Sequence, residues 1–238
     1  MEKYWKVLVW FIGLAVLILL ILFPIQKGQY MWRTVPLPLA GKTIVIDPGH
    51  GGPDGGAVGS DNTTEKEIAL EVSKKLRDYL QQAGALVYLT REEDKDLAAP
   101  DVRGYSKRKS EDIRNRLKFI HDKNPDLFIT VHLNALPSNR WSGAQTFYYP
   151  SFPENKHLAK MIQAEIIRNL ENTKRVPLPI DNIYLLKYAE VPGALVEIGF
   201  LSNEEERELL KDETYQEQMA ASIYQGIIRY VTEDMEEE

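Results

Sequence analysis

TIVIDPGHGGPDGGAVGSDNTTEKEIAL, residues 43–70, contains one strand–loop–helix unit. The β-branched run at residues 43–47 predicts a short strand, and the Pro-Gly pair after it predicts a turn. A loop with six glycines follows. Thr64 and Glu67 have the spacing of a capping box, which predicts a helix over residues 65–83. A buried strand that leads through a short loop into a helix is typical of α/β proteins.

Strand-like and helix-like segments alternate through the rest of the chain. Further strands are expected at residues 85–90, 126–133, 145–149, 183–188 and 194–198. Further helices are expected at residues 106–121, 157–170, 204–210 and 213–231. The alternation predicts the α/β class, as a single sandwich domain with a mostly parallel, twisted sheet of about six strands and helices on both faces.

The chain begins with an apolar segment. Residues 7–23 form an uncharged run of seventeen residues, close to the roughly 20 residues that a transmembrane helix needs. We expect an N-terminal transmembrane helix within residues 1–25, as a membrane anchor or an uncleaved signal, because no small-residue cleavage pattern follows. Lys3 and Lys6 favour a cytoplasmic N-terminus. A cleaved signal peptide and a buried helix are the alternatives.

Composition divides the rest of the chain. Residues 26–40 contain two prolines and are expected to be a linker. Residues 41–232 are enough for one catalytic domain with a full core, and residues 233–238 form an acidic tail. The net charge of −6, with no basic stripe, argues against a nucleic-acid partner. The absence of cysteine excludes a disulfide scaffold, a thiol nucleophile and a Cys-based zinc site.

Four chemically capable side chains occur where expected strands end or an expected helix begins: His50, Glu65, His132 and Glu197. The carboxyl ends of parallel strands lie at one rim of a sheet, where such folds build their sites. Two imidazoles and a carboxylate with one open position are the composition of a hydrolytic zinc site. A second carboxylate is what such a site needs to move protons.

Each of these residues also has a structural interpretation. A lone strand histidine such as His132 is more often a hydrogen-bonded core residue than a ligand. Glu65 suits the first turn of a helix, where the helix dipole favours an acid, and Glu197 could pair with an arginine. Asp47, at the end of the first strand, could orient His50. The glycine-rich loop lacks the patterns of phosphate-binding loops.

Five ordered blocks of sequence, within residues 42–226, carry a family resemblance. They are IVIDPGHGGPDGGAVG, the KEIAL after Glu65, the LTR at residues 89–91, DLFITVHLNA and PGALVEIGFLSN. Together they closely resemble the zinc-dependent N-acetylmuramoyl-L-alanine amidases of bacterial cell walls. The resemblance implies that His50, Glu65 and His132 bind one zinc ion per chain and that Glu197 is the catalytic residue. ITVHLNA departs mildly from the family pattern around the histidine, but no ligand is lost.

The resemblance also implies an activity and a location. The expected reaction is hydrolysis of the amide bond between the N-acetylmuramic acid lactyl group and L-alanine in peptidoglycan. The small size and the single apolar segment look most like the sporulation amidases of endospore formers, which implies muramic-lactam formation in the spore cortex. The expected protein is membrane-anchored through its N-terminal helix, with an extracytoplasmic catalytic domain that acts on peptidoglycan. Wall hydrolases are dangerous unless regulated, which favours a regulatory protein partner or timed expression.

Substrate contacts are harder to predict. Asn134 follows His132 on the same rim and could donate to the peptide. Arg91 could meet a stem-peptide carboxylate or pair with Asp94, and residues 95–109 are long enough to form a mobile wall of the cleft. Two other functions remain open, a zinc carboxypeptidase acting on the stem peptide and a non-catalytic wall-binding scaffold.

Overall fold

The computed structural model describes residues 2–31 and 37–235. The chain divides into two compact units, residues 1–36 and residues 37–238. The first contains α1 (Glu2–Met31), and the second contains the sheet and the remaining helices. The predicted linker at residues 26–40 therefore overlaps the end of α1, and its residues 32–36 lie outside the described part. The predicted acidic tail begins directly after the last helix, and its residues 236–238 also lie outside the described part.

The prediction of an N-terminal transmembrane helix is wrong. Across the described residues, no helix combines the length and the apolarity needed to cross a membrane. The uncharged run at residues 7–23 is the physical reason. Its seventeen residues extend about 25 Å as an α-helix, which is shorter than the roughly 30 Å hydrocarbon core of a bilayer.

The second unit is a mixed α/β domain built on a six-stranded sheet. The strands are β1 (Thr43–Pro48), β2 (Leu86–Leu89), β3 (Leu127–Asn134), β4 (Gln145–Tyr148), β5 (Leu178–Pro179) and β6 (Gly193–Phe200). Their order is β2-β1-β3-β6-β4-β5, and every neighbouring pair is parallel except β4 with β6. The predicted α/β class, the mostly parallel sheet and the six strands are confirmed.

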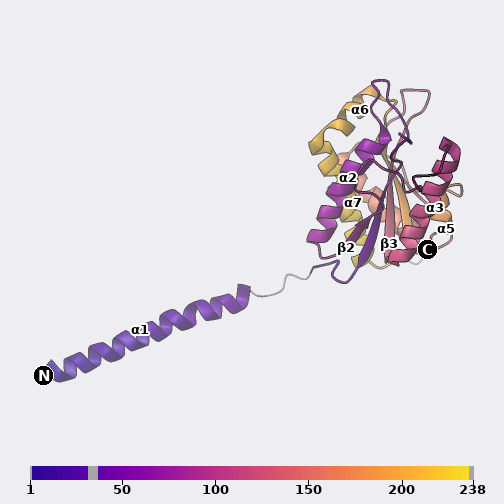
Figure 1. Ribbon diagram of the computed structural model, residues 1–238. Helices are drawn as coiled ribbons and strands as arrows, with labels where there is room; N and C mark the ends of the chain where they lie inside the picture. The colour runs from indigo at the N-terminus through magenta and orange to yellow at the C-terminus, as the bar shows by residue number, and fades with distance from the viewer. Residues whose placement is uncertain (1, 32–36, 236–238) are drawn as a thin grey trace. The chain divides into compact units, whose positions relative to one another are not determined.

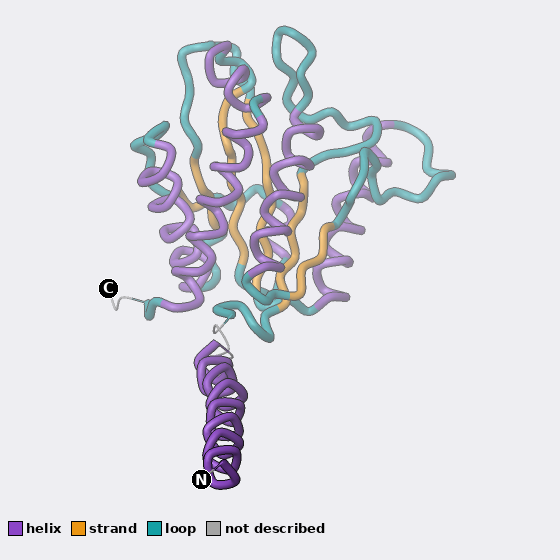
Figure 2. Tube along the Cα trace, turned by 90° about the vertical axis from the view of Figure 1, so that its left-hand side faces the viewer, coloured by secondary structure: helices purple, strands orange, loops and turns teal. Residues whose placement is uncertain are grey.

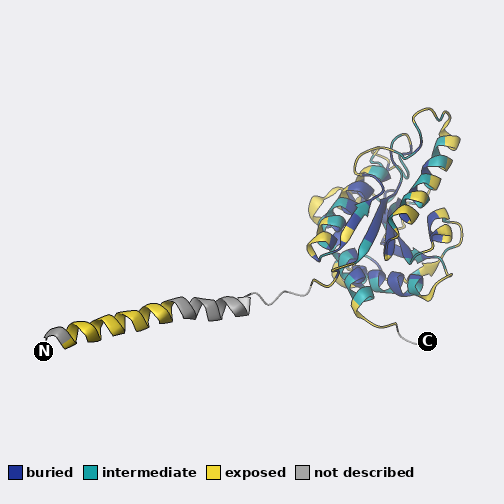
Figure 3. Ribbon diagram, turned by 60° about the horizontal axis from the view of Figure 1, so that its bottom comes forward, coloured by how far each residue is buried: buried dark blue, intermediate teal, exposed yellow. Residues whose placement is uncertain are grey.

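Helices cover both faces of this sheet (Figures 1 and 2). They are α2 (Glu65–Gln82), α3 (Tyr105–Lys123), α4 (Pro153–Leu170), α5 (Tyr184–Tyr188), α6 (Glu204–Lys211) and α7 (Glu213–Thr232). Successive side chains of β1 point to opposite faces of the sheet and join different hydrophobic cores. Ile44 and Ile46 join the larger core with α2, α4 and α7, whereas Val45 joins a smaller core with α3 and α5. Both faces of the sheet are therefore buried, as the dark blue strands of Figure 3 show.

Two local predictions fail for identifiable reasons. Residues 183–188, expected to be a strand, form the short helix α5. Leu185, Leu186 and Ala189 are buried in the smaller core, and their spacing places them on one side of a helical turn. The sixth strand is instead the two-residue β5, which sequence patterns miss because of its length. Thr64 does precede α2, but its hydroxyl makes no capping hydrogen bond.

The strand register brings the carboxyl ends of β1, β3 and β6 to one rim. Asp47 pairs with Thr130 across β1 and β3. His132 pairs with Glu197 across β3 and β6, and Glu197 pairs with Gln145 across β6 and β4. Since paired residues point to the same side of a sheet, the last three side chains form a row on the α3 and α5 face.

Candidate metal centre

His50, Glu65 and His132 converge at this rim. One ligand-capable atom from each lies within 4.8 Å of the others. His50 Nε2 is 3.2 Å from Glu65 Oε2, and His132 Nδ1 is 2.8 Å from Glu65 Oε1. The three residues come from the loop after β1, the first turn of α2 and the end of β3. Three distant segments of sequence therefore present two nitrogens and a carboxylate to one point, and these donors suit a divalent metal.

The Glu65 carboxylate is fixed by the backbone as well as by the imidazoles. Its side chain is 2% exposed. Oε1 accepts the N–H of Leu133 at 2.9 Å, and Oε2 accepts the N–H of Ala57 at 2.7 Å. Burial alone raises the pKa of Glu65, but the bonds and charges of His132 and His50 outweigh burial and leave this pKa lowered. The carboxylate is therefore ionised and immobile, as a metal ligand should be.

His50 is held on its other side by Asp54. His50 Nδ1 lies 2.9 Å from Asp54 Oδ2, and the same carboxylate receives Lys109 Nζ at 2.9 Å and the Tyr105 hydroxyl at 2.9 Å. Burial opposes protonation of His50, but Asp54 and Glu65 prevail and raise its pKa to about 9. Acidic surroundings that attract a proton to this point would also attract a metal cation. A carboxylate behind the imidazole also fixes its orientation.

Asp47 does not orient His50, contrary to the prediction. Its carboxylate accepts the hydroxyls of Thr90 and Thr130 at 2.6 and 2.7 Å and pairs with Arg116 at 2.8 Å. Arg116, from α3, also donates to the carbonyls of Pro48 and His50. Asp47 therefore acts on the site indirectly, because it anchors the arginine that holds the backbone of the histidine loop.

Two glycines leave room for the ligands. A Cβ on Gly49 would lie 2.5 to 2.8 Å from three ring atoms of His132, and one on Gly56 would lie 2.4 Å from Glu65 Oε2. Gly56 also has a φ of +70°, and His50 has a φ of +60°. Residues other than glycine rarely adopt this backbone conformation. The glycines of this loop thus allow its backbone to pack closely against the candidate ligands.

Gly49→Ala should therefore displace the His132 ring and weaken metal affinity by about 10- to 100-fold, the range seen when support of a ligand is lost. Metal titration of the purified chain measures this. Gly55→Ala is the matched control, because its Cβ would meet only a methyl group of Thr64 at 3.7 Å. Equal metal affinity for the two variants would contradict the role assigned to Gly49.

Glu197 lies beside the cluster without belonging to it. Its Oε2 is buried and, among the described residues, has no hydrogen-bond partner. Burial raises the pKa of Glu197 to about 7. No arginine or lysine forms an ion pair with it in the described part of the chain, so the structural interpretation as an arginine partner has no support here. A carboxylate with a pKa near neutrality and an open oxygen can both take up and release a proton.

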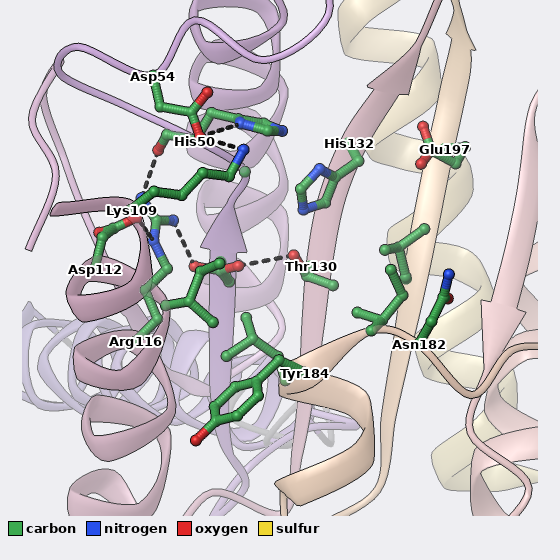
Figure 4. Close-up of a pocket in the computed structure, with 16 residues that line it drawn as sticks. His50, Asp54, Lys109, Asp112, Arg116, Thr130, His132, Asn182, Tyr184 and Glu197 are labelled. Atoms are coloured by element: carbon green, nitrogen blue, oxygen red, sulfur yellow. Dashed lines mark hydrogen bonds and ion pairs between the residues drawn. The ribbon is translucent and has the colours of Figure 1, made fainter. Parts of the chain in front are cut away.

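Two hollows meet at Glu197. The first, the central hollow, has a volume of about 340 Å³. Figure 4 shows His50, His132 and Glu197 in a row along its rim, with Lys109 of α3 on one side and Tyr184 of α5 below. The second, the β4 hollow, has a volume of about 240 Å³ and is lined by Asn134, Leu136, Trp141, Gln145, Phe147, Arg175, Glu197 and Phe200. Space on both sides of the Glu197 carboxylate suits an extended substrate.

The predicted substrate residues differ in position. Asn134 lines the β4 hollow, within reach of a molecule bound there. Arg91 is only 1% exposed, and its guanidinium donates to the carbonyls of Pro48, Gly49, Lys66 and Glu93. Its Asp94 alternative fails too, since Asp94 pairs with Lys66. In this structure Arg91 therefore braces the loop that carries His50.

Residues 95–104 are hydrogen-bonded and ion-paired to α3, whose first turn contains the rest of the predicted segment 95–109. The N–H groups of Leu97 and Ala99 donate to Asp112 and Glu111, and Arg108 pairs with Asp96 at 2.5 Å. Lys109 alone of this segment lines the central hollow. Of the predicted mobile wall, the structure thus places Lys109 at the site, and hydrogen exchange of residues 95–109 tests the mobility. Asp54, Arg116 and Arg175 were not predicted as site residues, although Asp54 follows His50 by only four residues in the quoted stretch.

Comparison with known proteins identifies the family of this chain. A family model described as N-acetylmuramoyl-L-alanine amidase matches residues 44–229. The chain is 51% identical to the germination-specific N-acetylmuramoyl-L-alanine amidase of Bacillus subtilis (strain 168), over 98% of this chain and 98% of that protein.

Solved structures agree with the sequence relatives. The CwlD amidase of Clostridioides difficile, in complex with the GerS lipoprotein, matches with a TM-score of 0.80 and 43% identity, covering 82% of this chain and 100% of that chain. AmiC2 of Nostoc punctiforme, an N-acetylmuramoyl-L-alanine amidase, matches with a TM-score of 0.70 and 29% identity, covering 80% and 98%.

Proposed function

Because this chain belongs to the N-acetylmuramoyl-L-alanine amidase family, we propose that His50, Glu65 and His132 hold one zinc ion and that Glu197 is the general base. The chain is an enzyme that hydrolyses the amide bond joining the muramic acid lactyl group to L-alanine in peptidoglycan. The observation that carries the proposed roles is the convergence of three ligand-capable atoms within 4.8 Å beside a buried carboxylate oxygen without a partner.

The donor set fits zinc. Two imidazoles with one carboxylate are the protein ligands of several hydrolytic zinc sites, and three ligands leave a position for water or substrate. Softer metals favour sulfur ligands, and the chain has no cysteine. When bound, the ion would polarise the scissile carbonyl and lower the pKa of a bound water molecule towards neutrality.

Residues of the chain transfer the proton, position the ligands and limit access of water. Glu197 takes the proton of the attacking water and returns it to the departing L-alanine nitrogen, which its pKa of about 7 permits. Asp54 and Glu65 keep the His50 ring in place from both sides. Ile113, Ile183 and Leu195 line the central hollow beside the polar groups. These apolar side chains limit access of bulk water and so strengthen the electrostatic interactions within the site.

The relatives support a proposal for the biological setting. A cell-wall role outside the cytoplasm is implied by peptidoglycan as substrate. We propose in addition that the enzyme acts on the spore cortex, in muramic-lactam formation needed for germination, because the relative that matches nearly its whole length is named germination-specific. We also propose that a protein partner regulates it, since a similar amidase was solved in complex with a lipoprotein.

Metal removal tests the proposed function. Purified peptidoglycan digested by the full chain should gain free L-alanine amino ends, detected by mass spectrometry. Treatment with a chelator should abolish this gain, and stoichiometric zinc should restore it, because the metal supplies several kcal/mol of charge stabilisation in the transition state.

The product identifies the reaction class. Release of D-alanine in place of new L-alanine ends would establish the carboxypeptidase alternative. Binding to peptidoglycan with no product, in chain shown to contain zinc, would establish the scaffold alternative. Full activity in the presence of chelator, with no metal detected in the protein, would refute the zinc site.

A further inference from the structure

The β4 hollow has the features of a binding site for an anionic group. It adjoins Glu197 on the β4 side, away from His50. Gln145, the register partner of Glu197, forms part of its floor. Trp141 is 41% exposed beside it. The tryptophan therefore offers an accessible aromatic ring beside the cavity and the Glu197 carboxylate.

Arg175 is held rigidly within this hollow. Its Nε and Nη2 each donate to the carbonyl of Ser142 at 3.3 Å, and its Nη1 donates to Gln145 Oε1 at 3.2 Å. Its guanidinium carbon lies 5.7 Å from the Trp141 ring centre and 5.3 Å from that of Phe200. Three hydrogen bonds leave two of the five guanidinium N–H groups available. The side chain is thus oriented before any ligand arrives, which lowers the entropy lost on binding.

Glu206 interacts electrostatically with Arg175 but does not form an ion pair with it: burial raises the pKa of Glu206, and the charge of Arg175 opposes this rise. Within residues 37–235, no carboxylate forms an ion pair with Arg175. The buried Glu206 accepts the N–H groups of Gly143 and Phe200 instead. Arg91 offers a contrast, since four backbone carbonyls occupy its donors. A fixed, partly buried guanidinium with free donors and no ion-paired carboxylate in the described chain is suited to bind a carboxylate from outside the chain.

Resting on the proposed function, we propose that Arg175 binds a carboxylate of the stem peptide and that the β4 hollow is the peptide-side subsite. The scissile amide lies at Glu197, so the two hollows must receive the two sides of that bond. The stem peptide is the side with carboxylates, the first of which belongs to the D-glutamate that follows L-alanine. The single unpaired cation of the β4 hollow matches this group, and the sugar is then directed to the central hollow.

Two soluble substrates that differ by one charge test this subsite. They are N-acetylmuramoyl-L-alanyl-D-glutamate and its α-carboxamide, N-acetylmuramoyl-L-alanyl-D-isoglutamine. The full chain loaded with zinc should cleave the acid with a kcat/KM about tenfold or more above that of the amide, because only the carboxylate can form a bidentate ion pair with the guanidinium. Arg175→Gln should lose this preference, so that its kcat/KM values for the two substrates become similar.

Arg140→Gln is the matched control. Arg140 also lies over the Trp141 ring, at 5.2 Å, but it does not line the β4 hollow. This variant should keep the preference for the acid. A melting temperature and zinc content like those of the unaltered enzyme show that Arg175→Gln is folded. Arg175→Lys should keep part of the preference because it keeps the charge.

The outcomes separate the subsite from the reaction. Equal rates on the two substrates for the unaltered enzyme, or a preserved preference in Arg175→Gln, would overturn the subsite while leaving the amidase intact. If neither substrate is cleaved, the reaction on such short substrates has failed, and calorimetric binding decides the subsite. L-alanyl-D-glutamate should then bind about tenfold more tightly than L-alanyl-D-isoglutamine, and only in chains that contain Arg175. Equal binding of the two dipeptides would overturn the subsite.

Discussion

Glu197→Gln is expected to lower kcat by about 10²- to 10⁴-fold, the range that general acid–base groups contribute, while zinc content stays unchanged. The amide of glutamine has the shape of the carboxylate but cannot accept the proton of the attacking water. Glu197 contacts none of the three candidate ligands by hydrogen bond in the described structure, so its loss should not release the metal. Activity on peptidoglycan and metal analysis of the same preparation measure the two quantities together.

The pH profile gives a second view of Glu197. A base works only when deprotonated, so kcat/KM of the unaltered enzyme should be high above its pKa and should fall as pH drops through it. Burial raises this pKa to about 7 in the metal-free chain, and a nearby cation lowers it. The acid limb is therefore expected below pH 7 and should be absent from the residual activity of the Gln variant.

Glu190→Gln is the control for this experiment. Glu190 is exposed and lies in the turn before β6, so its loss changes the net charge by the same amount at a distance from the site. It should retain full activity. A Glu197→Gln enzyme with full zinc and normal turnover would exclude Glu197 as the base.

The sequence predicts the convergence of the four rim residues because two local signals agree. Strand patterns identify β1, β3 and β6, and parallel strands place their carboxyl ends at one rim. His132 and Glu197 then become register partners. Glu65 is predictable because it is the first residue of a helix that begins at the same rim.

The supporting residues could not be predicted in the same way. Arg116 lies 66 residues from His50 in the chain and reaches it only because α3 packs beside β1. Arg175 lies in a segment without regular structure, and its orientation depends on Ser142 and Gln145 in another segment. Tertiary packing of irregular segments determines these contacts, and no periodic pattern in the sequence encodes it.

The position of Arg91 illustrates the same limit of prediction from sequence. From the sequence, an arginine just after a strand at the rim is free to meet substrate. In the fold, its guanidinium meets backbone carbonyls at the end of β1, in the loop that follows and in the first turn of α2, and buried carbonyls require donors. The guanidinium of Arg91 supplies them. Whether an arginine near a site binds substrate or backbone therefore depends on which buried acceptors the loop leaves unsatisfied.

Glu65→Ala is expected to remove zinc and to lower turnover by more than about 10³-fold, since losing several kcal/mol of metal stabilisation corresponds to that factor. Glu65 forms ion pairs with both histidines. Its loss also leaves the N–H groups of Leu133 and Ala57 without their acceptor, and each buried donor of this kind costs about 1–3 kcal/mol. Zinc analysis, turnover and thermal unfolding measure the three effects.

Glu67→Ala distinguishes these effects from a general loss in the helix. Glu67 lies in the same first turn of α2 but is exposed. Its removal takes away one acidic group from the helix N-terminus, which is worth about 0.3–1 kcal/mol, and touches neither histidine. Zinc should raise the melting temperature of the Glu67 variant as it does for the unaltered chain, because a ligand that binds only the folded state stabilises it. The Glu65 variant should show no such rise, and a zinc-dependent rise of normal size there would mean that the metal is held elsewhere.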